Sequence, residues 1–231
     1  PKPVPPVEDP KPQPEPPKPQ PQPEQPKPQP PVEDGPLILA EPVPGYVQTQ
    51  RVAGQMLMQE TGKLQERMGD LQTPSTDPQS WARIGGGFTQ EQGKDRLGYK
   101  SKSGFVQIGT DLSVDRRDNA VRRSGVMLSY GRADNKFYDK YHAKDGYIIA
   151  DKFTGKGRLE TANFGLYSTW YGDNGLYVDT TGHVGWIGAE YTANNGVKAK
   201  NSGLSLMANA EIGKEYQISD DGKWNFVPEA Q

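Results

Sequence analysis

LETANFGLYSTWYGDNGLYVDTTGHVGWI, residues 159–187, decides the fold expected for this chain. In its first half, most even-numbered positions are apolar and the odd-numbered positions are small or polar, as far as Trp170. The second half repeats this alternation, with Val184 and Trp186 on the apolar side. A Gly-Asp-Asn-Gly turn joins the two halves. Alternation with a period of two on both sides of a tight turn predicts a β-hairpin.

The apolar face of this hairpin could lie in either of two environments. In a soluble sheet it packs on a core, whereas in a membrane barrel it faces lipid and the polar face lines the lumen. The alternation recurs after Pro78, in runs at about 81–90, 104–114, 123–132, 204–216 and from 224 onward. We therefore expect about seven antiparallel strands over residues 79–231.

Charged side chains within these runs favour the membrane. They share a face with glycines and small polar residues, where burial in a dry core is costly and contact with a wet lumen is not. The polar residues predicted to face the lumen and contact the helix described below are Arg83, Asp111, Asp179, Glu211 and Glu229. The residues predicted to face lipid are Val106, Ile108, Leu128, Phe164, Leu166, Trp170, Val184 and Trp186, and Val114 is expected to lie on the same face as Val106.

The connections between the runs also alternate in length. Short turns are expected at 115–122, 171–175 and 217–223, and longer polar loops at 91–103, 133–158 and 189–203. Short turns at one end and long loops at the other are typical of outer-membrane barrels.

The first 45 residues have a different composition. Of the 22 prolines in the chain, 17 lie in residues 1–36, and KPQP occurs three times there. Because proline favours polyproline II and such a tract cannot bury a core, residues 1–45 are predicted to be a stiff spacer. A ligand for a proline-binding domain is the alternative.

A helical pattern occupies residues 46–73, between the spacer and the strands. Its apolar side is expected to comprise Val52, Met56, Leu57, Leu64, Met68 and Leu71. Three glycines, Gly54, Gly62 and Gly69, weaken the helix by about 1 kcal/mol each relative to alanine. Such a helix needs a wall to lie against, and the barrel lumen supplies one.

Net charge and cysteine content exclude several classes of function. The formal charge is −2, which gives no general attraction to nucleic acid. The chain has no cysteine, so it forms neither a disulfide nor a thiolate metal site.

Motifs spread along the chain carry a family resemblance. WARIGGGF, GVMLSYGRAD, GLYSTWYGDNGLYVDTTGHVGW and WNFVPEAQ follow the proline-rich tract and the lone helix in that order. This succession resembles the translocator domain of type V secretion autotransporters, in the branch of the diffuse-adherence adhesins, the actin-motility proteins and, more distantly, pertactin. The chain is expected to be a fragment of such a protein, because it has no passenger domain and runs out after about seven strands.

The resemblance implies a partial barrel of roughly twelve strands in the outer membrane of a Gram-negative bacterium. The helix is then expected in the lumen, and the proline-rich side at the cell surface. The implied partners are outer-membrane lipid, the barrel-assembly machinery and the protein's own passenger, an adhesin or virulence factor. The implied function is to anchor that passenger and help to export it.

The sequence contains no pattern that predicts an enzyme. His142 and His183 have no second histidine or cysteine at ligand spacing, so no metal, cofactor, nucleic acid or small-molecule substrate is expected. Some autotransporters cut their passenger at an asparagine in the lumen helix, but the first asparagine of this chain is Asn119. Two other functions stay open at this stage: a soluble periplasmic β-sheet binding module on a proline-rich spacer, and an adhesin that binds through loop 133–158.

Overall fold

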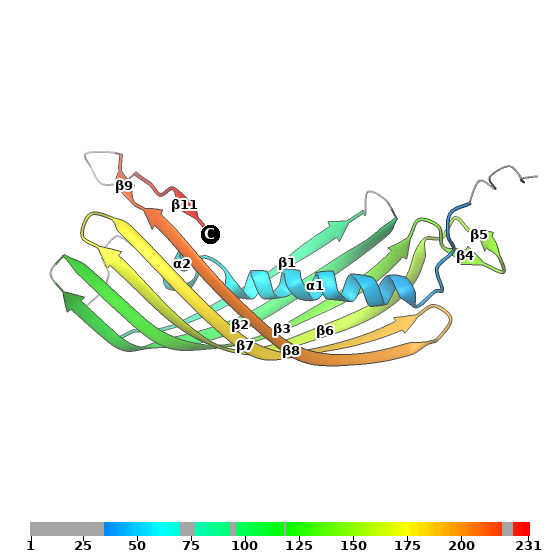
Figure 1. Cartoon of the computed structure of the whole chain (residues 1–231), viewed down its shortest axis with the longest axis horizontal. Helices are drawn as coiled ribbons and strands as arrows, with labels where there is room; N and C mark the ends of the chain where they lie inside the picture. The colour runs from blue at the N-terminus through cyan, green and yellow to red at the C-terminus, as the bar shows by residue number, and fades with distance from the viewer. Residues whose placement is uncertain (1–34, 70–76, 93–95, 118, 219–223) are drawn as a thin grey trace, which may run out of the picture. The chain divides into compact units, whose positions relative to one another are not determined.

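A seven-stranded antiparallel sheet forms most of the structure, a computed structural model that describes residues 35–69, 77–92, 96–117, 119–218 and 224–231 (Figure 1). Neighbours in the sheet are also neighbours along the chain. The strands, in this order, are β1 (Ser80–Glu91), β2 (Leu97–Arg117), β3 (Ala120–Asp139), β6 (Phe153–Gly172), β7 (Leu176–Ala193), β8 (Lys198–Lys214) and β11 (Glu229–Ala230). This curled all-β architecture confirms the expected fold class.

Two small hairpins accompany the main sheet. β4 (Ala143–Lys144) pairs with β5 (Tyr147–Ile148) in the connection between β3 and β6. β9 (Tyr216–Gln217) pairs with β10 (Asn225–Phe226) in the connection between β8 and β11. The run expected to start at Trp224 therefore joins the main sheet only through its last residues, in β11.

The strands extend further than the sequence pattern predicted. β2 begins at Leu97 and β3 continues to Asp139, within the stretches expected to be loops 91–103 and 133–158. The loop expected at 189–203 is a tight connection, 194–197, because β7 and β8 pair as far as Thr192 and Lys198. The pattern failed there because the apolar side changes faces. The outer positions become polar, as at Lys136, and the apolar residues lie on the inner face, as at Tyr99 and Phe137, while backbone pairing continues.

A β-bulge corrects one predicted face. The pairing of β2 with β3 shifts register between Asp111 and Ser113. After the bulge, Val114 lies opposite Arg123, whose side chain is buried on the helix-facing side. Val114 is thus not on the face of Val106, because the extra residue reverses the alternation.

The outer face of the sheet, which points away from the helix, is apolar across its middle. The eight residues predicted to face lipid are all exposed in this structure, to between 37% and 56% of their surface. The register brings them into rows across the sheet, such as Ile108, Leu128, Phe164, Val184 and Leu206. A contiguous apolar surface that extends across five strands favours contact with an apolar environment such as lipid.

The helical segment lies along the inner face of the sheet (Figure 1). It consists of α1 (Val43–Thr61) and α2 (Leu64–Met68). Leu71, which the sequence placed on the apolar side, falls outside the described residues. Among the described residues, no helix combines the length and the apolar character that a membrane crossing needs.

Apolar contacts hold the helix at two levels of the wall. Val52 and Met56 are buried in one cluster, with wall residues Tyr99, Ala133, Phe137, Leu159, Tyr191 and Ala193. Leu64 is buried in a second cluster with Tyr171 and Tyr177, and Met68 packs against it. Leu57 is only half-buried.

Glycines on the inner wall make room for aromatic rings. The ring of Phe105 covers Gly85 and the ring of Tyr167 covers Gly125, so closely that a Cβ atom at either glycine would overlap the ring. Tyr177 covers Gly213 in the same way. Glycine within a strand is unfavourable on its own, and its use here is explained by the close approach of a neighbouring ring.

The break between the two helices depends on Gly62. Its φ of 57° is in the left-handed region, which favours glycine. Its N–H donates to the Met58 carbonyl at 3.2 Å, and the Lys63 N–H donates to the Glu66 carboxylate at 3.2 Å. The chain therefore ends one helix and starts the next within two residues.

Substituting two glycines of the helical segment tests this assignment. Gly62→Ala is expected to destabilise the protein by at least about 1–2 kcal/mol, because a left-handed alanine is strained and its Cβ would overlap the Arg83 guanidinium. Gly54→Ala is the matched control: the site is open, and alanine in a helix interior adds about 0.5–1 kcal/mol. Chemical unfolding of the full gene product that contains this chain measures both, and equal effects would contradict the role of Gly62.

Two arginine substitutions on one strand test the outer face. Leu206 and Ser202 are both exposed on the outer side of β8, but Leu206 is in the apolar band and Ser202 lies in a row with Arg132 and Glu160. If the band meets lipid, Leu206→Arg costs roughly 2–4 kcal/mol, and Ser202→Arg costs about 0–1 kcal/mol. The folded fraction in lipid vesicles, read from heat-dependent gel mobility, measures both. Equal tolerance would show that the band does not face lipid.

Candidate functional site

The interface between the helix and the inner wall contains four buried charged side chains: Glu60, Arg67, Asp179 and Glu211. Glu60, on α1, is 2% exposed. Its carboxylate accepts hydrogen bonds from Ser129 at 2.6 Å, from the Asn163 amide at 2.6 Å and from Thr161. Three short polar side chains from β3 and β6 thus hold one carboxylate of the helix in the middle of the wall.

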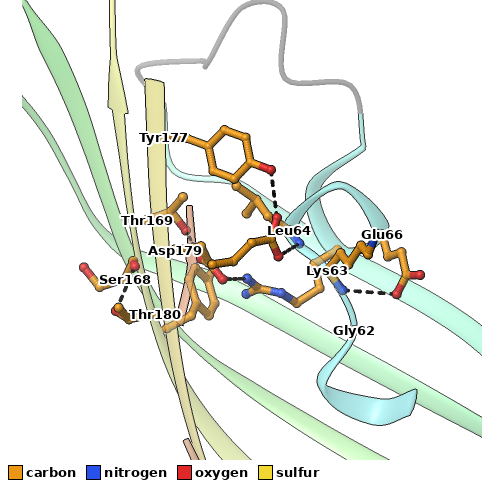
Figure 2. A network of polar contacts seen from close by, with 12 residues as sticks. Gly62, Lys63, Leu64, Glu66, Ser168, Thr169, Tyr177, Asp179 and Thr180 are labelled. Carbon is orange, nitrogen blue, oxygen red and sulfur yellow. Dashed lines mark hydrogen bonds and ion pairs between the residues drawn. The ribbon is translucent and has the colours of Figure 1, made fainter. Parts of the chain in front are cut away.

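A buried ion pair lies at the α2 level. Arg67 donates to Asp179 of β7, and both side chains are fully buried (Figure 2). Asp179 also accepts from the Thr169 hydroxyl at 2.6 Å, so each carboxylate oxygen has a partner. The Arg67 guanidinium lies 5.5 Å from the ring centre of Tyr167, within range of a cation–π contact.

The start of α2 is held by a third acidic group. The backbone N–H of Leu64 donates to Glu211 at 3.0 Å, and the hydroxyl of Tyr177 donates to the other Glu211 oxygen at 2.8 Å (Figure 2). A carboxylate at this position satisfies a free N–H of the first turn and complements the positive end of the helix. Lys63 pairs with Glu229 of β11, where the lysine side chain is about half exposed.

Arg83 connects β1 to the break between the helices. It donates to the carbonyl of Glu60 and to the carboxylate of Glu66, at 3.1 Å for the latter. Gln107 of β2 accepts from the Arg83 Nε at 2.7 Å. The carbonyls at the end of α1, which lack partners within the helix, are thereby bound by the wall.

The structure thus brings four of the five predicted lumen residues against the helix: Arg83, Asp179, Glu211 and Glu229. Asp111, the fifth, is bound within the wall instead. Arg123 donates to it at 2.6 Å and the Tyr167 hydroxyl at 2.8 Å, and the backbone N–H of Gln79 donates at 2.9 Å.

Glu60 is the central residue that the sequence analysis missed. It lies four residues after Met56 and eight after Val52, on the side of α1 that was judged apolar. A lone carboxylate on that stripe, together with Ser129, Thr161 and Asn163 on the small polar face of the strands, was the available signal. The bonding roles of Arg123 and Tyr177 had no comparable signal.

The contacts described above are those of a docking interface. No group of three or more His, Asp or Glu side chains among the described residues is placed to hold a metal ion. His142 lies next to the residues that precede α1. Its Nδ1 is 2.7 Å from the Asp151 carbonyl, and its Nε2 is 3.4 Å from the carboxylate of Glu41. His183 is buried on the inner wall.

Comparison with known proteins assigns the family. The model of the autotransporter β-domain matches residues 80–231, more than half of the chain. The chain belongs to the autotransporter β-domain family. This finding confirms the resemblance seen in the sequence and places the chain among outer-membrane translocators of Gram-negative bacteria.

Several known proteins are similar to this chain in sequence. The chain is 30% identical over 176 residues to the serine protease EspP of Escherichia coli, covering 75% of this chain and 12% of EspP. It is 27% identical over 190 residues to the uncharacterized protein YuaQ of E. coli K12, covering 73% of this chain and 13% of YuaQ. It is 22% identical over 166 residues to the adhesin BmaC autotransporter of Brucella suis, covering 68% of this chain and 4% of BmaC. The chain thus spans about an eighth of the length of EspP and YuaQ, and less of BmaC.

A solved autotransporter structure has the same fold. The transport unit of the autotransporter AIDA-I from E. coli aligns with a TM-score of 0.60 and 20% identity, over 78% of this chain and 55% of that structure. The matched autotransporter domain is a translocator and not a catalytic domain, so the protease named in EspP gives no reason to expect catalysis here.

A double-mutant cycle on Arg67 and Asp179 tests the buried pair of this autotransporter domain. Removal of either partner alone, by Arg67→Met or Asp179→Leu, leaves an uncompensated buried charge and is expected to cost about 3–5 kcal/mol. The double variant is expected to lose much less than the sum of the two. Chemical unfolding of the full gene product gives the three values, and strictly additive losses would contradict a direct pairing.

Proposed function

We propose that this chain is the helix-and-barrel part of an outer-membrane translocator, which anchors an N-terminal passenger and helps to export it to the cell surface. The observation that carries the proposal is the path of the helical segment. It follows the inner wall and is bound at each level by wall side chains, from Glu41 to Arg67. A chain that has passed through a barrel is expected to occupy it in this way.

The path also supports an orientation. At its N-terminal end, the segment contacts the connection 140–152 and the end of β7, through His142 and Tyr191. At its C-terminal end, it contacts Tyr177 and Asp179, next to the tight turn between β6 and β7. Because long loops of outer-membrane barrels face outward and short turns face the periplasm, we infer that the proline-rich residues 1–45 are at the cell surface.

The same inference assigns the partners. Outer-membrane lipid is the proposed partner of the outer apolar band, and the barrel-assembly machinery is the proposed partner during insertion. The proposed passenger is an adhesin or virulence factor, a class that the name of BmaC supports. We propose no enzymatic activity, cofactor or small-molecule substrate for this chain.

A soluble periplasmic binding module explains the observations less well. The soluble-module hypothesis does not explain the apolar outer band, in which Leu204 and Leu206 are both 86% exposed. It would also leave a helix with buried charges on the face where a ligand should bind. Extraction of membranes with carbonate separates the two functions, since recovery of the full gene product in the wash contradicts the translocator.

Deletion of residues 46–71 tests whether the helix fills the lumen. In the full gene product, we expect the strands still to insert, the conductance of the barrel in planar bilayers to rise, and the melting temperature to fall. The rise follows because the helix occupies the space between the walls, and the fall because two apolar clusters and the contacts of Glu60 and Arg67 are lost. Unchanged conductance would place the helix outside the lumen and contradict the proposal.

A further inference from the structure

The outer face of the sheet carries three rows of mainly polar residues between the apolar band and the loop end. The row next to the band contains Arg132 and Glu160. The second row runs across five strands as Lys102, Asp134, Arg158, Glu190 and Lys200. The third, nearest the loops, runs as Lys100, Lys136, Lys156, Thr192 and Lys198.

In the second row, two acidic residues compensate two of the three basic residues. Its charges alternate in sign from strand to strand, so neighbours attract one another. Arg158 lies 3.5 Å from Asp134, and Lys200 lies 2.5 Å from Glu190. This row needs no ligand to explain its charges.

The third row has the opposite property. Lys100, Lys136 and Lys156 lie directly opposite one another on three adjacent strands, an arrangement that destabilises a sheet. None of the three forms an ion pair with a residue that the structure describes, and the nearby acidic groups Asp134 and Glu190 already have partners. The Lys100 ammonium lies 5.8 Å from the ring centre of Tyr138, but no described carboxylate pairs with any of the three lysines. Three cations in one row without an anionic partner point to an anion from outside the chain.

The surface is hollowed at this row. A hollow of about 540 Å³ is lined by all three lysines, together with Phe88, Lys102 and Arg158. Asp134 and Glu190 also line it, but they are already paired with Arg158 and Lys200. Its size is within the range of about 300–1,000 Å³ for small-molecule sites. The site therefore offers a phosphate-sized anion several cations, and offers an attached group the apolar ring of Phe88.

The distance of the hollow from the apolar band indicates which class of ligand could reach it. On β3, Lys136 is six residues beyond Tyr130, which shares the last row of the band with Trp186. Six residues of strand rise roughly 20 Å, or about 15 Å along the barrel axis at a tilt of roughly 40°. The headgroup zone of an ordinary phospholipid leaflet is only about 5–8 Å thick. A taller, sugar-based headgroup reaches this height.

We propose that the hollow around Lys100, Lys136 and Lys156 binds a phosphate group of an outer-leaflet glycolipid. The inference rests on the proposed function, because it takes the sheet as an outer-membrane barrel with its long connection outward. The phosphate accepts charge-assisted hydrogen bonds from the lysines, and the acyl chains of the same lipid cover the apolar band below. The lipid thereby removes the repulsion in the lysine row.

Retention of lipid by paired variants tests the site. The full gene product is purified from outer membranes in mild detergent, and the phosphorylated glycolipid held per protein is measured by native mass spectrometry. K136Q/K156Q is expected to retain at least about tenfold less than the wild type, since two charge-assisted contacts are lost. R122Q/K214Q removes the same charge from the opposite end of the sheet, away from the hollow, and is expected to retain as much as the wild type.

Vesicle binding separates the sources of phosphate. The wild type is expected to gain thermal stability from vesicles with phosphorylated glycolipid, and to gain less from the dephosphorylated lipid, from phosphatidylglycerol or from inorganic pyrophosphate. Equal retention by the two double variants, or equal stabilisation by any of those three, overturns the glycolipid site. Heat-dependent gel mobility reports insertion separately: inserted barrels with no difference in lipid contradict this site alone, whereas failure to insert contradicts the proposed function.

Discussion

A charged helix can lie within this sheet because its buried charges meet partners on the wall. Glu60 faces three short polar side chains, and Arg67 faces Asp179. An unpaired charge at either place would be costly, so the position of the helix along the barrel axis is fixed by where these partners lie. The apolar clusters above and below then add stability without choosing the position, since leucine and methionine tolerate small shifts.

The partners of the helix in turn constrain the wall. Small polar residues and glycines occupy the inner positions opposite the helix, and aromatic rings cover some of the glycines instead of filling the lumen. Because successive residues of a strand point to opposite faces, each inner polar residue is followed by an outer apolar one through the band. The sequence of each central strand is therefore constrained on both faces, by contacts with the helix on the inner face and by the apolar band on the outer face.

This double requirement explains what could be predicted from the sequence. Asp179 and Leu166 were assigned to opposite faces from alternation alone, and the structure places them so. Val114 was misplaced because a bulge leaves no mark in a pattern of apolar residues. The extent of β3 was missed because beyond Tyr130 the outer face becomes polar, as at Lys136, and the apolar residues Ala133 and Phe137 lie on the inner face instead. The contacts of Glu60 depend on the vertical position of the helix relative to the strands, which no periodicity within one segment can specify.

The same long strands have a mechanical consequence. A bilayer needs about 9–11 residues of a tilted strand, whereas β2, β3 and β6 have 21, 20 and 20 residues. Much of each strand is therefore expected to extend beyond the hydrocarbon layer, and these extended, hydrogen-bonded strand ends form a collar around the helix. The helix leaves this collar at its rim, beside Tyr191 and His142, and not at the level of the lipid. The helix therefore begins among paired strands that extend well beyond the apolar band, and the height at which it begins is set by folded structure.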